Sequence, residues 1–166
     1  MKLLTLLLSF SIGTSAMAQM SNIKLEAIIK STADTYGGDS GRWQFQINET
    51  VFIMLTDSTN NRMRIISPIA EVASLDDDQL KSSLIANFHT ALDVKYAIAE
   101  NVLWSAFIHP LRELSNEQVK DAISQVYYAN VNFGSSYAST SLIFPGNAKE
   151  EESLPIEEEG SGKRKF

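Results

Sequence analysis

Two histidines, His89 and His109, are the side chains in this sequence best suited to metal binding or to acid–base chemistry near neutral pH. A zinc site needs three or four ligands, and the chain has no cysteine to supply a thiolate. No second histidine follows either one at the spacing of a helical metal motif. We therefore expect no metal and no cofactor. An acid–base pair between His109 and a distant carboxylate stays open.

The acidic clusters have simpler explanations than catalysis. A calcium loop at 73–84, around the run Asp76-Asp77-Asp78, lacks the central glycine and the final glutamate that such a loop needs. Negative charge in the first turn of a helix explains this run better. The clusters 150–152 and 157–159 lie in an acidic tail, where a catalytic pair would not be held rigidly.

The serine and glycine patterns also fall short of known catalytic motifs. The run Gly134-Ser135-Ser136 lacks the closing glycine of a nucleophile elbow. The glycine-rich run 37–41 stands after a predicted helix and before a predicted strand, the reverse of a phosphate-binding loop. We predict no catalytic residues and no enzyme activity. A hydrolase whose site these motifs do not reveal is the third of the functions that we consider, after the two binding functions described below.

Three amphipathic stretches predict helices. The first runs from Met20 to Tyr36 and is stopped by two glycines. The second runs from Asp76 to Leu92, and its apolar residues at every fourth position predict a buried stripe: Leu80, Leu84, Phe88 and Leu92. The third opens at Ser115, which forms a capping box with Gln118.

Alternating and β-branched residues predict the strands. Strands are expected at 42–48 and 50–56, joined by a turn at Asn48-Glu49, and at 62–72. Pro68 suggests an edge position or a bulge in the third of these. A hairpin follows at 95–110, with its turn at Glu100-Asn101. The segment 135–144 fits either a last strand or an extended segment.

The hairpin at 95–110 carries the residues with the best claim to a binding site. With the turn at Glu100-Asn101, Tyr96, Ile98, Leu103 and Phe107 share the face that we assign to the core. Trp104 then lies on the opposite face among three small residues, Ala97, Ala99 and Ala106. This arrangement fits a buried indole that the alanines accommodate. It also fits a groove in which Trp104 anchors a partner.

The two ends of the chain differ in composition from its body. Lys2, an apolar run and the site Ala16-Met17-Ala18 are typical of a signal peptide, so residues 1–18 are expected to be removed after Ala18. The mature chain, 148 of the 166 residues, would be periplasmic or secreted. We assign 19–146 to a single domain and 147–166 to an acidic, disordered tail. The net charge of −6 argues against a nucleic-acid partner, and no further segment predicts a membrane span.

The expected order α-β-β-β-α-β-β-α predicts an α+β domain with a largely antiparallel sheet packed with helices. This order resembles the type III secretion chaperone fold, which the YbjN-like proteins share. The residues that carry the resemblance lie between Met20 and Gly146: Asn87, Tyr96-Ala97-Ile98, Leu103-Trp104, His109-Pro110-Leu111, Leu114, Gln125-Val126, Tyr137, Leu142 and Phe144. The resemblance implies a homodimer that holds an extended polypeptide on its surface.

These observations predict an exported, non-catalytic binding module, chaperone-like in action. It would hold a polypeptide or an envelope component on its sheet surface, around Trp104. The main alternative is a periplasmic domain that binds a small molecule or senses a signal, which would show a closed pocket.

Overall fold

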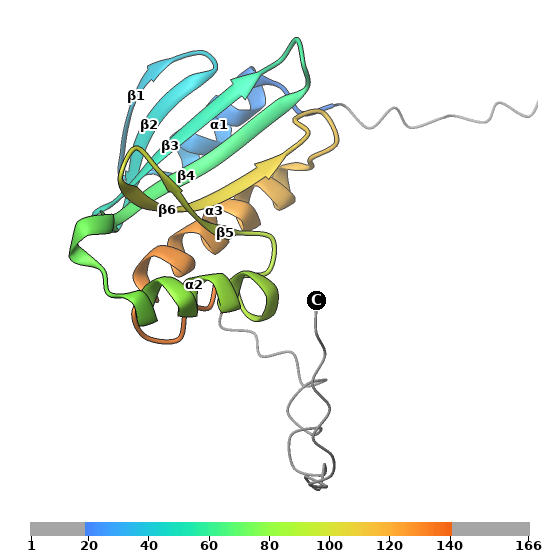
Figure 1. Ribbon diagram of the computed structural model, residues 1–166. Coiled ribbons are helices and arrows are strands. Elements are labelled where there is room, and N and C mark those ends of the chain that lie inside the picture. The colour runs from blue at the N-terminus through green and yellow to red at the C-terminus, as the bar shows by residue number, and fades with distance from the viewer. Residues whose placement is uncertain (1–18, 141–166) are drawn as a thin grey trace, which may run out of the picture.

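The computed structural model describes residues 19–140, which form an antiparallel sheet and three helices (Figure 1). The predicted α+β class is therefore confirmed. In chain order the elements are α1 (Asn22–Thr32), β1 (Thr35–Asp39), β2 (Arg42–Ile47), β3 (Thr50–Asp57), β4 (Arg62–Glu71), the 3-10 turn η1 (Val72–Ser74), α2 (Asp77–His89), β5 (Lys95–Ala99), β6 (Val102–His109) and α3 (Asn116–Val131). Both the expected signal peptide and the expected acidic tail lie outside the described residues.

The sheet has six strands in the order β1-β2-β3-β4-β6-β5, and every neighbouring pair is antiparallel. Helices α1 and α3 lie together behind one face of it, which we call the inner face (Figure 1). Helix α2 lies at one end of the molecule, next to β5. The opposite, outer face is covered by no helix of residues 19–140. Strands β1 and β5 form the two edges of the sheet.

The hydrophobic core fills the space between the inner face and the two helices behind it. Phe45 and Phe52, paired across β2 and β3, stack with ring centroids 5.0 Å apart. From the helices come apolar side chains that are fully buried: Leu25, Ile29, Val119 and Val126. No helix within residues 19–140 has the length and apolar character needed to cross a membrane.

Strand β1 was not expected, because the sequence predicted that the first helix would continue to Tyr36. The helix instead ends at Thr32, and Ala33 already has an extended backbone with ψ of 144°. Asp34 then accepts a hydrogen bond from the backbone N–H of Asn48 at 2.8 Å, which directs the chain along the edge of β2. The glycines that were expected to stop a helix lie within this edge strand.

Helix α2 has the predicted start but not the predicted buried face. Asp76 and Gln79 form a capping box, as the acidic run suggested. The expected buried stripe is wrong, since Leu84 and Phe88 are exposed, whereas Ser83 and Ala86 are the buried residues. Helix α2 packs at the edge of the sheet and not over it, which leaves only these two of its residues buried.

The predicted turns are confirmed. Asn48-Glu49 and Glu100-Asn101 both have two consecutive positive φ angles, the geometry that suits tight two-residue hairpins. Pro68 sits at a register shift in β4, which lies between β3 and β6, so it marks a bulge and not an edge. At the start of α3 the Ser115–Gln118 capping box forms as expected.

One expectation about the last strands needs correction, and one alternative that the sequence left open is decided for part of its segment. Ile98, assigned to the core, is 56% exposed, because it lies on the edge strand β5. In the segment 135–144, residues 135–140 form turns and bends and not a strand. Residues 141–144 lie outside the described part of the chain.

Candidate functional site

The outer face is left by the described fold without a covering layer, and strand register determines which residues it presents. Partners across antiparallel strands point to the same side. One row of partners crosses five strands of the sheet: Gly37, Gln44, Ile53, Ile66 and Ala106. The row therefore passes from a polar margin at β1 and β2 to an apolar centre.

The centre of the outer face is apolar although no helix covers it. Val51, Ile53, Leu55 and Ile66 are half-buried there, screened mainly by one another and by neighbouring strands. Ile108, which pairs with Arg64, is 61% exposed. An apolar strip of this kind is unusual for a face that meets water on its own, because an antiparallel sheet normally alternates apolar and polar residues.

Trp104 lies on the outer face, at the end of the strip nearest the β5 edge. Its register partners are Ala97 on one side and Pro68 on the other. The indole is half-buried, and its Nε1–H donates to the carbonyl of Ala99 at 3.1 Å. This bond directs the ring toward β5 and satisfies its polar atom, and the indole remains partly exposed.

The three alanines that were grouped with Trp104 are placed differently from one another. Ala97 and Ala99 are exposed on β5. Ala106 points to the same side but is only 7% exposed, because it is flanked by Ile66 and Lys95. On the side of the indole toward the β5 edge, the available surface is therefore made by Ala97 and Ala99.

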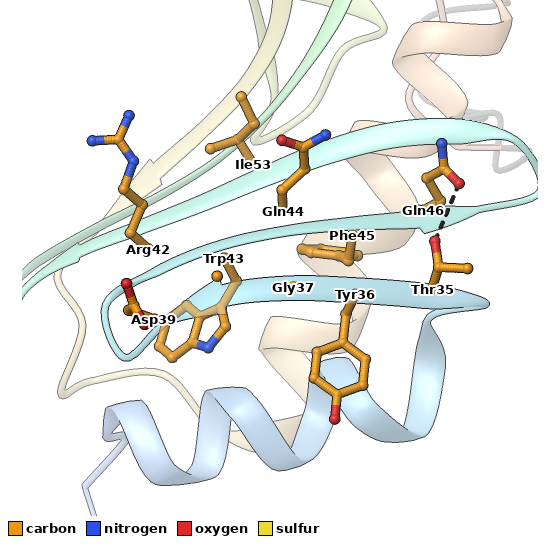
Figure 2. Close-up of a pocket in the computed structure, with 11 residues that line it drawn as sticks. Thr35, Tyr36, Gly37, Asp39, Arg42, Trp43, Gln44, Phe45, Gln46 and Ile53 are labelled. Atoms are coloured by element: carbon orange, nitrogen blue, oxygen red, sulfur yellow. Dashed lines mark hydrogen bonds between the residues drawn. The ribbon is translucent and has the colours of Figure 1, made fainter.

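At the opposite margin, strands β1 and β2 form a shallow hollow of about 590 Å³ (Figure 2). Figure 2 shows Arg42, Gln44 and Ile53 on one side of the strands, with Tyr36 and Trp43 on the other, toward α1. Gly37 lies between them, and a Cβ built on it would meet no atom within 4 Å. The missing side chain at Gly37 thus leaves space beside Gln44 and Ile53.

The polar groups at this margin suit a polypeptide backbone. The amide of Gln44 carries both a donor and an acceptor, as does each peptide unit. Gln46 also lies at this margin, where its Oε1 accepts from the Thr35 hydroxyl at 3.1 Å. Sequence reasoning missed this part of the surface because β1 was not recognised as a strand. The alternation of Thr35, Gly37 and Asp39 is the signal that marks its outward positions.

A second hollow, of about 530 Å³, lies where β6 extends beyond the start of β5 and faces α3. His109 lines it together with two carboxylates, Asp93 and Asp121. Those carboxylates accept from the amide of Gln125, at 3.4 and 2.7 Å respectively. His109 Nδ1 lies 2.8 Å from the carbonyl of Pro110, and its ring stacks on Phe107. The groups in this hollow are thus engaged with protein atoms.

The carboxylate of Glu113 is close enough to His109 for their charges to interact, but it is not suited to proton transfer near neutral pH. The amide of Asn61 donates to both of its oxygens at 3.0 Å and lowers the pKa of Glu113. Among residues 19–140 there is no group of three or more histidine or acidic side chains that could hold a metal ion. His89 lies in the last turn of α2, where it suits the helix dipole.

Comparison with solved structures shows that the fold is that of the secretion chaperones. A chain in the structure of the HopA1–SchA chaperone–effector complex matches with a TM-score of 0.52 and 11% sequence identity, over 68% of this chain and 94% of that chain. A chain in the structure of the ExsC–ExsE complex matches with a TM-score of 0.52 and 10% identity, over 68% and 95%. No family model and no curated protein matches the sequence. The likeness at these identities concerns the fold alone.

Proposed function

We propose that this protein is an exported, non-catalytic binding module that holds an extended polypeptide on the outer face of its sheet. The single observation that carries the proposal is the uncovered apolar strip of the outer face, with Trp104 at one end and the Gly37 hollow at the other. An extended chain laid across such a face can place alternate side chains in apolar positions and hydrogen-bond at the polar margin.

The fold comparison supports a binding role. One of the similar folds comes from a structure of a chaperone–effector complex. In this chain the role would be exercised outside the cytoplasm, because the predicted signal peptide directs the chain to the periplasm or beyond. The occupant would accordingly be a polypeptide or another component of the cell envelope.

A homodimer is part of the proposal. The exposed edges at β1 and β5 offer backbone groups that a second copy can pair with. Self-association through an edge would leave the outer face open and extend it across two copies.

Binding of a small molecule remains the second candidate, and the hollow beside His109 is the observation that favours it. That hollow is lined by side chains from β5, β6 and α3, and it contains acidic, basic and aromatic groups. His109→Ala would abolish binding of such a ligand and leave polypeptide binding unchanged. The same substitution tests the third-ranked alternative, a hydrolase.

Site-specific photo-crosslinking in living cells tests the main proposal. A photoreactive residue at Ile53, on the outer face, should capture a polypeptide partner. The same residue at Lys120, exposed on α3, is the control. Equal capture from both positions, or capture from Lys120 alone, would exclude the outer face as the binding surface.

A further inference from the structure

A second unpartnered apolar surface lies on α2, away from the outer face. Three side chains within a little more than one helical turn are exposed: Leu84 by 68%, Ile85 by 52% and Phe88 by 87%. We call these three residues the α2 patch. Within the described part of the chain nothing covers the patch, and exposed apolar side chains that lie next to one another are typical of a contact surface.

The chain returns to the end of α2 after leaving α3. The backbone N–H of Ser139 donates to the carbonyl of Thr90, the C-cap of α2, at 3.1 Å. The hydroxyl of Thr90 donates back to the carbonyl of Tyr137 at 3.2 Å. Ser139 is fully buried. The path of residues 137–139 is thus fixed against α2, and the chain beyond Thr140 starts beside this helix.

The residues that follow are the apolar part of the C-terminal region. Leu142, Ile143 and Phe144 follow the fixed segment after two intervening residues, and Pro145-Gly146 separates them from the acidic residues beyond. Leu84 precedes Thr90 by six residues, or about 9 Å along the helix axis. Four extended residues after Thr140 span about 13 Å. The apolar segment is therefore long enough to reach the whole patch.

We propose that residues 142–144 pack on the α2 patch and cover Leu84, Ile85 and Phe88. The pairing would join two apolar segments, and the bonds between Thr90 and residues 137–139 keep them close together. This contact would also bring the acidic residues after the segment close to the α2 end of the molecule. Covering of the patch by a second copy of the chain is the competing outcome that the test must separate.

Disulfide trapping tests the contact cleanly, because the chain has no cysteine of its own. In the full chain, Phe88→Cys combined with Phe144→Cys should form a disulfide within one chain under mild oxidation. The matched control, His89→Cys with Phe144→Cys, has almost the same tether but places the thiol on another side of the helix. We expect the first pair to react about tenfold faster, as a higher effective concentration requires. Equal rates, or disulfides that form only between two chains, would overturn the proposal.

A second measurement does not depend on trapping. Leu142→Ser with Phe144→Ser should accelerate amide hydrogen exchange in α2 and increase binding of an apolar dye. The control, Leu154→Ser with Phe166→Ser, makes the same two changes in the acidic tail and should alter neither readout. Exchange in α2 that is unchanged by the first pair of substitutions would also overturn the proposal. Because neither readout involves the outer face, both are independent of the proposed polypeptide binding.

Discussion

At the scale of single residues, the proposed site depends on one large side chain, that of a tryptophan, and on the space left by a glycine. Trp104 and Gly37 lie near opposite ends of the outer face. The sequence placed Trp104 on the correct face, because a two-residue turn at Glu100-Asn101 determines the register of the hairpin. The hollow at Gly37 was not predicted, because it results from a missing side chain in a strand that the sequence did not reveal.

Tyr96 gives a residue-scale prediction for stability against pH. Its hydroxyl is buried and donates to the carbonyl of Ala129 at 2.8 Å, and burial raises the pKa of Tyr96 well above its usual value. The folded state therefore holds this proton more tightly than the unfolded state does. The resulting stability is complete below about pH 10, the pKa of an unperturbed tyrosine, and falls as the pH rises above it.

Urea unfolding at pH 8 and at pH 11 measures this effect. Tyr96→Phe should cost about 1 kcal/mol at pH 8, through the lost hydrogen bond, and should lose less stability than the wild type on going to pH 11. Tyr128→Phe, at a more exposed position on α3, is the control and should follow the wild type. An identical pH dependence in wild type and Tyr96→Phe would show that Tyr96 is not the titrating group.

At the scale of elements, periodicity predicted most helices and strands, but it could not say what each apolar face would contact. The four-residue spacing of Leu80, Leu84 and Phe88 correctly indicates an amphipathic helix. It does not reveal that α2 packs at the edge of the sheet, which leaves two of these residues exposed. Strand β1 was missed for a related reason, because two glycines in a row normally indicate a loop and not an edge strand.

The two glycines of β1 give a matched pair of substitutions. Gly38 has φ of 106°, and an added Cβ would collide with the carbonyl oxygen of Arg42, so Gly38→Ala should destabilise the fold by about 1–3 kcal/mol. Gly37 has open space around it, so Gly37→Ala should change stability by no more than about 1 kcal/mol. Thermal or urea unfolding compares them. Equal losses from both substitutions would contradict the described geometry of β1.

At the scale of the whole molecule, the secretion-chaperone fold could be predicted from the order of elements and from core and turn residues such as Tyr96 and Leu103. The fold class therefore follows from local patterns that the sequence displays. The identity of the occupant of the outer face cannot be predicted in this way, because any extended chain with suitably spaced apolar side chains fits the same strip. Export and self-association rest on the predicted signal peptide and on the two sheet edges.

Export predicts a defined N-terminus. The protein recovered from cells should begin at Gln19, because cleavage is expected after Ala18. N-terminal sequencing of the protein from the periplasmic and extracellular fractions measures this directly. An Ala16→Leu, Ala18→Leu variant, which removes the small residues of the cleavage site, should accumulate uncleaved. A full-length chain found in the cytoplasm would contradict the prediction of export.

Self-association predicts the mass in solution. Light scattering of the mature protein at micromolar concentration should give twice the mass of one chain. If an edge strand mediates the contact, a proline at Ile98 on β5 or at Tyr36 on β1 should reduce the mass to that of a monomer, because the backbone N–H of each points away from the neighbouring strand and proline cannot donate a hydrogen bond to a second copy. A wild-type protein with the mass of one chain would remove the dimer from the proposal.

The affinity of the outer face for an extended peptide tests the central claim most directly. A peptide selected from a displayed library against the wild-type domain would be titrated into wild type, Trp104→Ala, Gly37→Val and Tyr128→Ala. If Trp104 anchors the peptide, its truncation should cost on the order of 2 kcal/mol, or about thirtyfold in Kd. Gly37→Val should also weaken binding by filling the hollow, and Tyr128→Ala, an aromatic truncation on α3, should have no effect. Unchanged affinity in Trp104→Ala and Gly37→Val, with both variants folded, would contradict the claim that this face holds a polypeptide.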